Sequence, residues 1–282
     1  MTGQWFHYRD VPPDRTVLEH IRAHSDWDQA TARLRGRFEP NLGVAIPVPV
    51  DDLRREIARA YGDLGWYRWR STPGGSYSGL AVTHNPERGA GERYNGLLGH
   101  ERYRDLATED YFAVDRQIDA AYRVRGDYLD TLGFRRLNDF SPYPALSPLL
   151  GGFRRPISRS RIASLFGVSQ VSPPDVGWHV DEPPTTLLRI NICIESDADY
   201  ALEYQDGPAI PIAAGECLVV NTDVQHRVAV RHPSISTRSH LVIGVLPWLD
   251  YDADQDAWRL NDFYGRIHPY DMVREGLIHA GL

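Results

Sequence analysis

Cysteine, long apolar runs and basic leader segments are all scarce in this sequence. The two cysteines, Cys193 and Cys217, both lie inside apolar runs, so we expect buried thiols in a reducing, cytoplasmic compartment and no disulfide framework. No stretch approaches the roughly 18 apolar residues of a membrane-spanning helix. The N-terminus also lacks a basic segment followed by an apolar one, so we expect neither a secretion signal nor a membrane span.

Excess positive charge is also absent. The formal net charge is −7, from 31 basic and 38 acidic residues. Nonspecific nucleic-acid binding requires a basic face, so we expect no nucleic-acid partner. The apolar fraction of 42% and the charged fraction of 24% are typical of a globular protein, and 282 residues can bury a core without disulfides.

The first half of the chain has a mixed helical and extended pattern. Apolar residues recur at helical spacing in 13–38 and 108–129. Asp51 or Asp52 is a candidate N-cap for a further helix, which Gly62 should end.

Two strands are predicted at 66–70 and 77–83, followed by a loop at 85–94 that is long enough to form a flap. These strands are either structural or part of a substrate wall. Three residues on or beside them are candidate substrate contacts: Arg70, Tyr77 and His84.

From Arg159 onward, short β-rich runs alternate with turn signals, a pattern typical of a sandwich or barrel. The runs are 161–170, 176–181, 186–195, 199–204, 216–221, 225–231 and 237–247. We therefore predict a mainly β protein with flanking helices. Its parts are a mixed α/β N-terminal region (1–155) that packs on the core and supplies substrate walls, a catalytic β core (156–248) and a C-terminal helical extension (249–282).

Three candidate metal ligands lie in the β-rich part. Side chains two residues apart on a strand share a face, so His179 and Asp181 can reach one ion. His226 lies on a later run. Two histidines and one carboxylate form the facial triad of non-haem Fe(II) oxygenases, which leaves positions open for a keto acid and for dioxygen.

Arginine side chains are expected beside this ion. If 225–231 and 237–247 form a hairpin centred near residue 232, Arg238 lies directly across from His226 on the same face. Its guanidinium suits the distal carboxylate of 2-oxoglutarate. Alternation also places Arg189 on the inner face of its strand, where a buried charge needs an anionic partner.

The region from about Arg159 to Leu249 resembles the aspartyl/asparaginyl β-hydroxylase family, which includes bacterial free-proline hydroxylases, within the Fe(II)/2-oxoglutarate-dependent dioxygenases. The matching stretches are Ser169 with Pro173-Pro174, Trp178 to Asp181, Leu188 to Ile192, Ala214 to Glu216, Leu218 to Val220, Asn221 to His226, and Arg238 to Ile243. The resemblance implies a double-stranded β-helix (jelly roll, cupin-like) core. It also implies Fe(II), 2-oxoglutarate and dioxygen as cofactor and cosubstrates.

The same resemblance implies roles for individual residues. His179, Asp181 and His226 would bind iron, and Arg238 would bind the far carboxylate of 2-oxoglutarate. Three more residues would lie near the cosubstrate: Arg189, Ser169 and Asn191. Some family members carry a histidine where this chain has Asn191, so cosubstrate contacts there would differ. The connection from His226 to Arg238 is longer than expected, which suggests a longer turn.

The implied reaction is hydroxylation of an unactivated C–H bond, with release of succinate and CO2. Its substrate would be polar: an amino acid, a peptidyl residue or a biosynthetic intermediate. Trp178, beside a ligand, points away from the barrel interior by parity, and either core packing or the rim of a substrate pocket would explain it. The tail at 261–270 caps the core, closes over the pocket or contacts a second copy in a homodimer.

Two other functions remain open at this point. A metal-dependent cupin could isomerise or hydrolyse a small molecule, although Arg238 and the single carboxylate argue against it. A non-catalytic ligand-binding barrel could retain the fold, although an intact His179–Asp181–His226 set argues against that.

Overall fold

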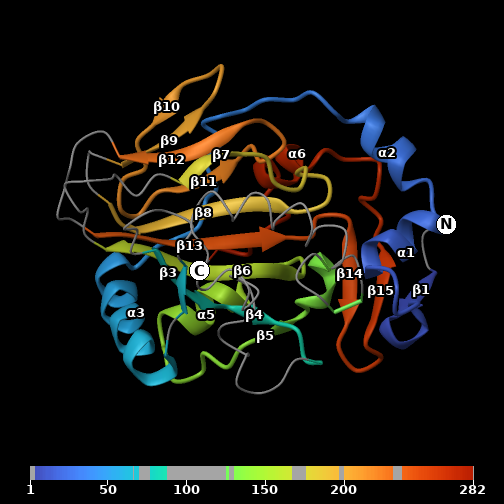
Figure 1. Cartoon of the computed structure of the whole chain (residues 1–282), viewed down its shortest axis with the longest axis horizontal. Coiled ribbons are helices and arrows are strands. Elements are labelled where there is room, and N and C mark those ends of the chain that lie inside the picture. Colours follow the sequence, from blue (N-terminus) through green and yellow to red (C-terminus); the bar gives the residue numbers. More distant parts are fainter. Residues whose placement is uncertain are drawn as a thin grey trace.

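Eight consecutive strands form the core of the protein (Figure 1). The structure is a computed structural model, and it describes residues 4–65, 67–69, 77–87, 125–126, 130–166, 176–196, 200–230 and 237–281. The strands are β6 (Ile157–Phe166), β7 (Val176–His179), β8 (Leu188–Glu195), β9 (Tyr200–Tyr204), β10 (Ala209–Ile210), β11 (Cys217–Val220), β12 (His226–Val230) and β13 (Thr237–Val245). Each of the seven predicted runs overlaps one of them, although β6 begins four residues before the predicted run, and the short β10 was not predicted.

These strands form two antiparallel sheets. The large sheet has the order β11-β8-β13-β6, and the small sheet has the order β10-β9-β12-β7. The chain therefore passes from one sheet to the other at nearly every connection, as it does in a jelly roll. The predicted double-stranded β-helix fold is confirmed.

Two strands from the N-terminal region widen the large sheet. β3 (Tyr77–Ala81) pairs with β6, and β2 (Tyr67–Trp69) pairs with β3. Both strands were predicted from the sequence. Nearby, β4 (Thr83–His84) pairs with β5 (Arg136–Leu137).

The tail is not simply helical, so that prediction for 249–282 is wrong in its first part. β14 (Leu249–Asp252) and β15 (Ala257–Leu260) form a hairpin, and β1 (Trp5–His7) adds to its edge. The partner strand comes from the opposite end of the chain, and local composition contains no signal of such a pairing. Only α6 (Pro269–Arg274) is helical among the described residues of the tail.

Helices and 3-10 turns pack around the sheets. In the part of the chain before β6 that the structure describes, they are η1 (Tyr8–Asp10), α1 (Val17–Ala23), α2 (Trp27–Arg33), α3 (Val50–Leu64), η4 (Thr131–Gly133) and α5 (Leu146–Gly151). The predicted helix at 108–129 lies outside the described residues except for 125–126, which form a turn, and most of the predicted flap lies outside them too.

The ends of α3 differ from the prediction. The N-cap is Pro49, without a side-chain hydrogen bond, and Asp51 lies in the first turn, where a carboxylate still interacts favourably with the helix dipole. The helix continues through Gly62 and stops at Gly65, whose backbone angles (φ 73°, ψ 165°) are open to glycine but to few other residues.

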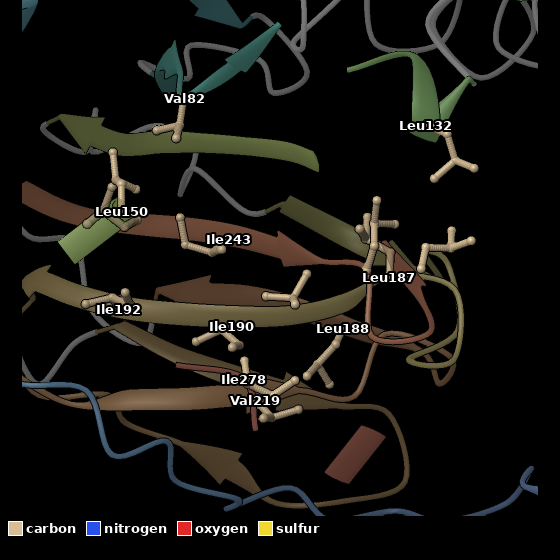
Figure 2. Packing of buried hydrophobic residues seen from close by; sticks show 14 of the residues in the cluster. Val82, Leu132, Leu150, Leu187, Leu188, Ile190, Ile192, Val219, Ile243 and Ile278 are labelled. Carbon is tan, nitrogen blue, oxygen red and sulfur yellow. The ribbon is translucent and has the colours of Figure 1, made fainter. Parts of the chain in front are cut away.

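Strand alternation divides the core into two clusters. Leu188, Ile190 and Ile192 belong to the larger cluster (Figure 2), on the face of β8 that α3 contacts. Cys193 has the opposite parity and packs between the sheets, in a cluster with Leu202, Tyr204, Ile210, Ile212 and Val220. Cys217 belongs to the larger cluster. Both thiols are buried, as predicted.

A buried carboxylate joins the N-terminal helices to this core. Asp130 accepts hydrogen bonds from the backbone N–H of Val17, 3.0 Å away at the start of α1, and of Gly126, 2.7 Å away. Burial, the largest effect, raises the pKa of Asp130 to about 6, although the N–H groups and Arg135 act in the opposite direction.

The stability of the protein should therefore depend on the protonation of Asp130. Because its folded-state pKa is raised above the ordinary 3.8, protonated Asp130 makes its full contribution to stability below about pH 4. As the pH rises through about 6, this contribution is lost, and the free energy of unfolding falls by about 3 kcal/mol. In urea titrations between about pH 4 and pH 7, we expect the free energy of unfolding to fall less for Asp130→Asn than for the wild type. The exposed Asp14→Asn serves as control and should keep the wild-type slope. A wild-type slope in Asp130→Asn would contradict the prediction.

Candidate metal centre

Two histidines meet on neighbouring strands of the small sheet. β7 and β12 pair antiparallel with His226 directly across from His179, and their ring centroids are 4.3 Å apart. Asp181 follows just after β7 ends, and its Oδ2 lies 4.0 Å from Nε2 of His179. One ligand atom from each residue lies within 4.8 Å of the other two. The structure thus brings the three predicted ligands together.

The backbone after β7 is held against the turn before β12. The N–H of Asp181 donates to the carbonyl of Thr222 at 2.8 Å, and Thr222 Oγ1 donates to the carbonyl of Glu182 at 2.6 Å. This double attachment keeps the carboxylate ligand beside the strand that carries His226, even though the ladder of β7 has ended.

The environment of His226 favours a neutral imidazole that can bind a metal. It is 5% exposed, and its Nδ1 lies 3.0 Å from the carbonyl oxygen of Val224. A carbonyl only accepts, so the proton is on Nδ1, and Nε2 keeps its lone pair for a metal. Burial, followed by the nearby His179, lowers the pKa of His226, which favours the uncharged ring that ligation requires.

The donor set fits a mononuclear iron centre. Two imidazoles and one carboxylate are the ligands of the facial triad, which leaves coordination positions free for other molecules. The side chains of His179 and Asp181 are each 37% exposed. The cluster is therefore accessible on that side, whereas His226 closes it on the other.

Arg238 reaches the interior from the opposite sheet, so the predicted hairpin is wrong. β12 pairs with β7 and β9, whereas β13 pairs with β6 and β8, where Arg238 lies opposite Leu165. The predicted register assumed a turn within one sheet, but this connection in a jelly roll crosses between sheets. Arg238 is still buried on the inner face, because His240, two residues further along β13, lies directly across from the inward Cys193.

A buried histidine contacts this arginine. Nη2 of Arg238 lies 3.4 Å from Nδ1 of His240, which is fully buried. A guanidinium only donates, so Nδ1 of His240 holds the lone pair and Nε2 holds the proton. Nε2 has no hydrogen-bond partner among the described residues. Burial and the charge of Arg238 lower the pKa of His240 well below its ordinary value, so the ring is neutral.

Arg189 has the anionic partner that its burial demands. Its Nη2 lies 3.5 Å from Oε2 of Glu182, and its Nη1 donates to the carbonyl of Arg159 at 2.9 Å. Burial alone would raise the pKa of Glu182, but Arg159 and Arg189 outweigh that effect and lower it. Asn191 is buried on the same face of β8, and Ser169 lies outside the described residues.

The predicted substrate contacts are dispersed. Trp178 is 41% exposed, and the guanidinium of Arg227 stacks 4.6 Å from the centre of its ring, on the outer face of the small sheet. His84 is buried in β4. The backbone of Tyr77 begins β3, and Arg70 lies outside the described residues.

Sequence reasoning missed Glu182 and Arg159 and gave no role to His240. Glu182 directly follows a predicted ligand, which was the available signal, but strand alternation would have pointed it away from the site. The position of Arg159 depends on an irregularity in β6 that has no signature in the sequence.

No protein-family model and no curated protein matches the chain. Among solved structures, it is similar to the non-haem alpha ketoglutarate-dependent epimerase SnoN from nogalamycin biosynthesis, with 12% identity over 81% of this chain and 87% of that one and a TM-score of 0.39. It is also similar to a Pseudomonas putida prolyl-4-hydroxylase (11% identity, 73% and 89% coverage, TM-score 0.34). A third similar structure is protein NMB1881 from Neisseria meningitidis (24% identity, 32% and 73% coverage, TM-score 0.23).

Strand order and side-chain geometry define the class: a jelly-roll protein with a His-Asp-His cluster arranged as a candidate facial-triad site. Among the residues that the structure describes, no helix is long and apolar enough to cross a membrane.

Proposed function

We propose that the protein is an Fe(II)- and 2-oxoglutarate-dependent oxygenase. The observation that carries this proposal is the His179–Asp181–His226 cluster within a jelly roll. A facial triad leaves room for a bidentate keto acid and for dioxygen. The buried Arg238 on the facing sheet supports the choice of keto acid, because its planar fork matches a second carboxylate.

The residues of the candidate site have separate roles in this proposal. His179, Asp181 and His226 hold the ion, and Arg238 binds the far carboxylate and so orients the cosubstrate. Bound iron would supply the oxidative chemistry, in which 2-oxoglutarate is converted to succinate and CO2. The apolar cluster around Cys193 excludes water from the space between the sheets.

The finer assignment is hydroxylation of a C–H bond in a polar substrate: an amino acid, a peptidyl residue or a biosynthetic intermediate. The resemblance of 159–249 to the aspartyl/asparaginyl β-hydroxylase family supports it. Residues 1–155 would supply the substrate walls, consistent with the continuation of the large sheet into β3 and β2. We place the enzyme in the cytoplasm, with a homodimer as its proposed assembly.

The function can be tested by adding Fe(II) and 2-oxoglutarate to the protein without oxygen. We expect a weak visible charge-transfer absorption, because a keto acid chelates iron on this triad. Admission of oxygen should then yield succinate. Zn(II) in place of Fe(II) is the control and should give neither signal. If the iron sample also gives neither, the protein is a metal cupin of other chemistry or a binding barrel.

A further inference from the structure

A buried ion cluster lies directly behind the candidate ligand Asp181. The next residue, Glu182, has its Oε1 2.7 Å from Nη1 of Arg159 and its Oε2 3.5 Å from Nη2 of Arg189. Oγ1 of Thr131 donates to Oε1 at 2.9 Å. The side chains of Glu182, Arg159 and Arg189 are only 21%, 13% and 6% exposed. Three elements distant in sequence thus converge on one carboxylate.

Arg159 reaches this carboxylate from a strained backbone position. Its φ is 45°, in the left-handed region that residues other than glycine rarely occupy. The ladder between β6 and β13 shifts its register here, between Val242 and Gly244. A bulge of this kind redirects a side chain, and holding a residue other than glycine in this conformation destabilises the fold.

Gly244 makes room for the bulge. A Cβ at this position would clash with the carbonyl oxygen of Ser158 and would lie 3.1 Å from Nη1 of Arg189. The same Nη1 donates to the carbonyl of Arg159 at 2.9 Å. Arg189 therefore holds both the strained backbone and, through its other nitrogen, Glu182.

The cluster is connected to the metal ligand through the backbone. The carbonyl of Glu182 accepts from Oγ1 of Thr222 at 2.6 Å, and the N–H of Asp181 donates to the carbonyl of Thr222 at 2.8 Å. The side chain of Glu182 is held by two arginines, and its main chain is held by the turn that precedes β12. Asp181 is thereby fixed from both sides.

Stability alone does not explain this arrangement. Desolvation of buried charges offsets much of their attraction, so a buried ion cluster is weak support for stability. Backbone strain adds to that cost, and strain of this kind concentrates at functional sites. The cluster also ends at the residue next to a candidate ligand, and hydrogen-bonded neighbours of metal ligands commonly set their orientation.

We propose that Glu182 is a positioning residue, whose ion pairs with Arg159 and Arg189 fix the backbone so that the carboxylate of Asp181 reaches an ion held by His179 and His226. This inference rests on the metal site of the proposed function. It does not depend on the cosubstrate or on the reaction.

The test is Mn(II) affinity, measured by calorimetric titration of wild-type protein and of Glu182→Gln. Glutamine keeps the size of the side chain and an acceptor for Thr131 but removes the charge. We expect Mn(II) to bind about 10–100-fold more weakly. The control is Glu203→Gln, which alters an ion pair with Arg227 (2.8 Å) on the outer face of the same small sheet and should bind Mn(II) as the wild type does.

A second variant separates positioning from folding. Arg159→Gly removes the ion pair but also relieves the strained φ, so we expect Mn(II) affinity to fall while the unfolding midpoint in urea changes little. Wild-type Mn(II) affinity in folded Glu182→Gln and Arg159→Gly would overturn the positioning role while leaving the proposed function intact. If the wild type itself binds no Mn(II), the metal site of the proposed function fails too.

Discussion

His179→Ala is expected to weaken the binding of Mn(II) or Fe(II) by at least about a hundredfold, because even the loss of a partner that only orients a ligand costs 10–100-fold. The variant removes one of three ligand atoms and leaves Asp181 and His226 in place. His179 is partly exposed, so truncation leaves little buried cavity, and the variant should fold. Anaerobic titration with Mn(II), alongside circular dichroism, measures both properties.

His24→Ala is the matched control, since His24 is an exposed histidine at the end of α1. It should bind Mn(II) as tightly as the wild type. If His179→Ala retains the wild-type affinity, the ligand assignment is wrong.

Arg238→Gln is expected to weaken 2-oxoglutarate binding by at least about thirtyfold, because loss of one partner of a buried charge pair costs about 2–5 kcal/mol. Arg238 is 6% exposed, so its interaction with the far carboxylate would be poorly screened by water. Affinity for Mn(II) should change little, since the ligands lie on the other sheet. Titration of the Mn(II)-loaded protein with 2-oxoglutarate under nitrogen measures the effect.

Arg55→Gln, on the exposed side of α3, is the control and should bind 2-oxoglutarate normally. Arg238→Lys keeps the charge but loses the planar fork, so its affinity should be intermediate. Equal loss of metal and 2-oxoglutarate binding in Arg238→Gln would show that Arg238 serves the fold rather than the cosubstrate.

Local periodicity predicted the two faces of β8 correctly. Alternation along β8 separated the inward Arg189 and Cys193 from the outward Ile190 and Ile192, and the structure has the same division. The requirement that a buried arginine be paired also held, although the sequence did not identify the partner. These properties depend on neighbours in the chain, and sequence patterns report such neighbours well.

Pairings between distant segments could not be predicted in the same way. Turn residues between His226 and Arg238 are compatible with a hairpin and with a connection between sheets, and only packing of the whole sandwich decides between them. The same holds for the tail, whose hairpin is completed by β1 from the other end of the chain. The left-handed φ of Arg159 likewise depends on space beside Gly244.

The placement of His226 and Arg238 on facing sheets has a consequence for cosubstrate choice. Sheets packed face to face are about 10 Å apart, and here the separation is maintained by the interior side chains around Cys193 and Tyr204. If the proposed function holds, the span between the ion and the carboxylate anchor would therefore be the thickness of the sandwich rather than the reach of a loop. The packing that stabilises the fold would then also set the length of keto acid that fits. Keto acids with one carbon fewer or one carbon more should bind more weakly.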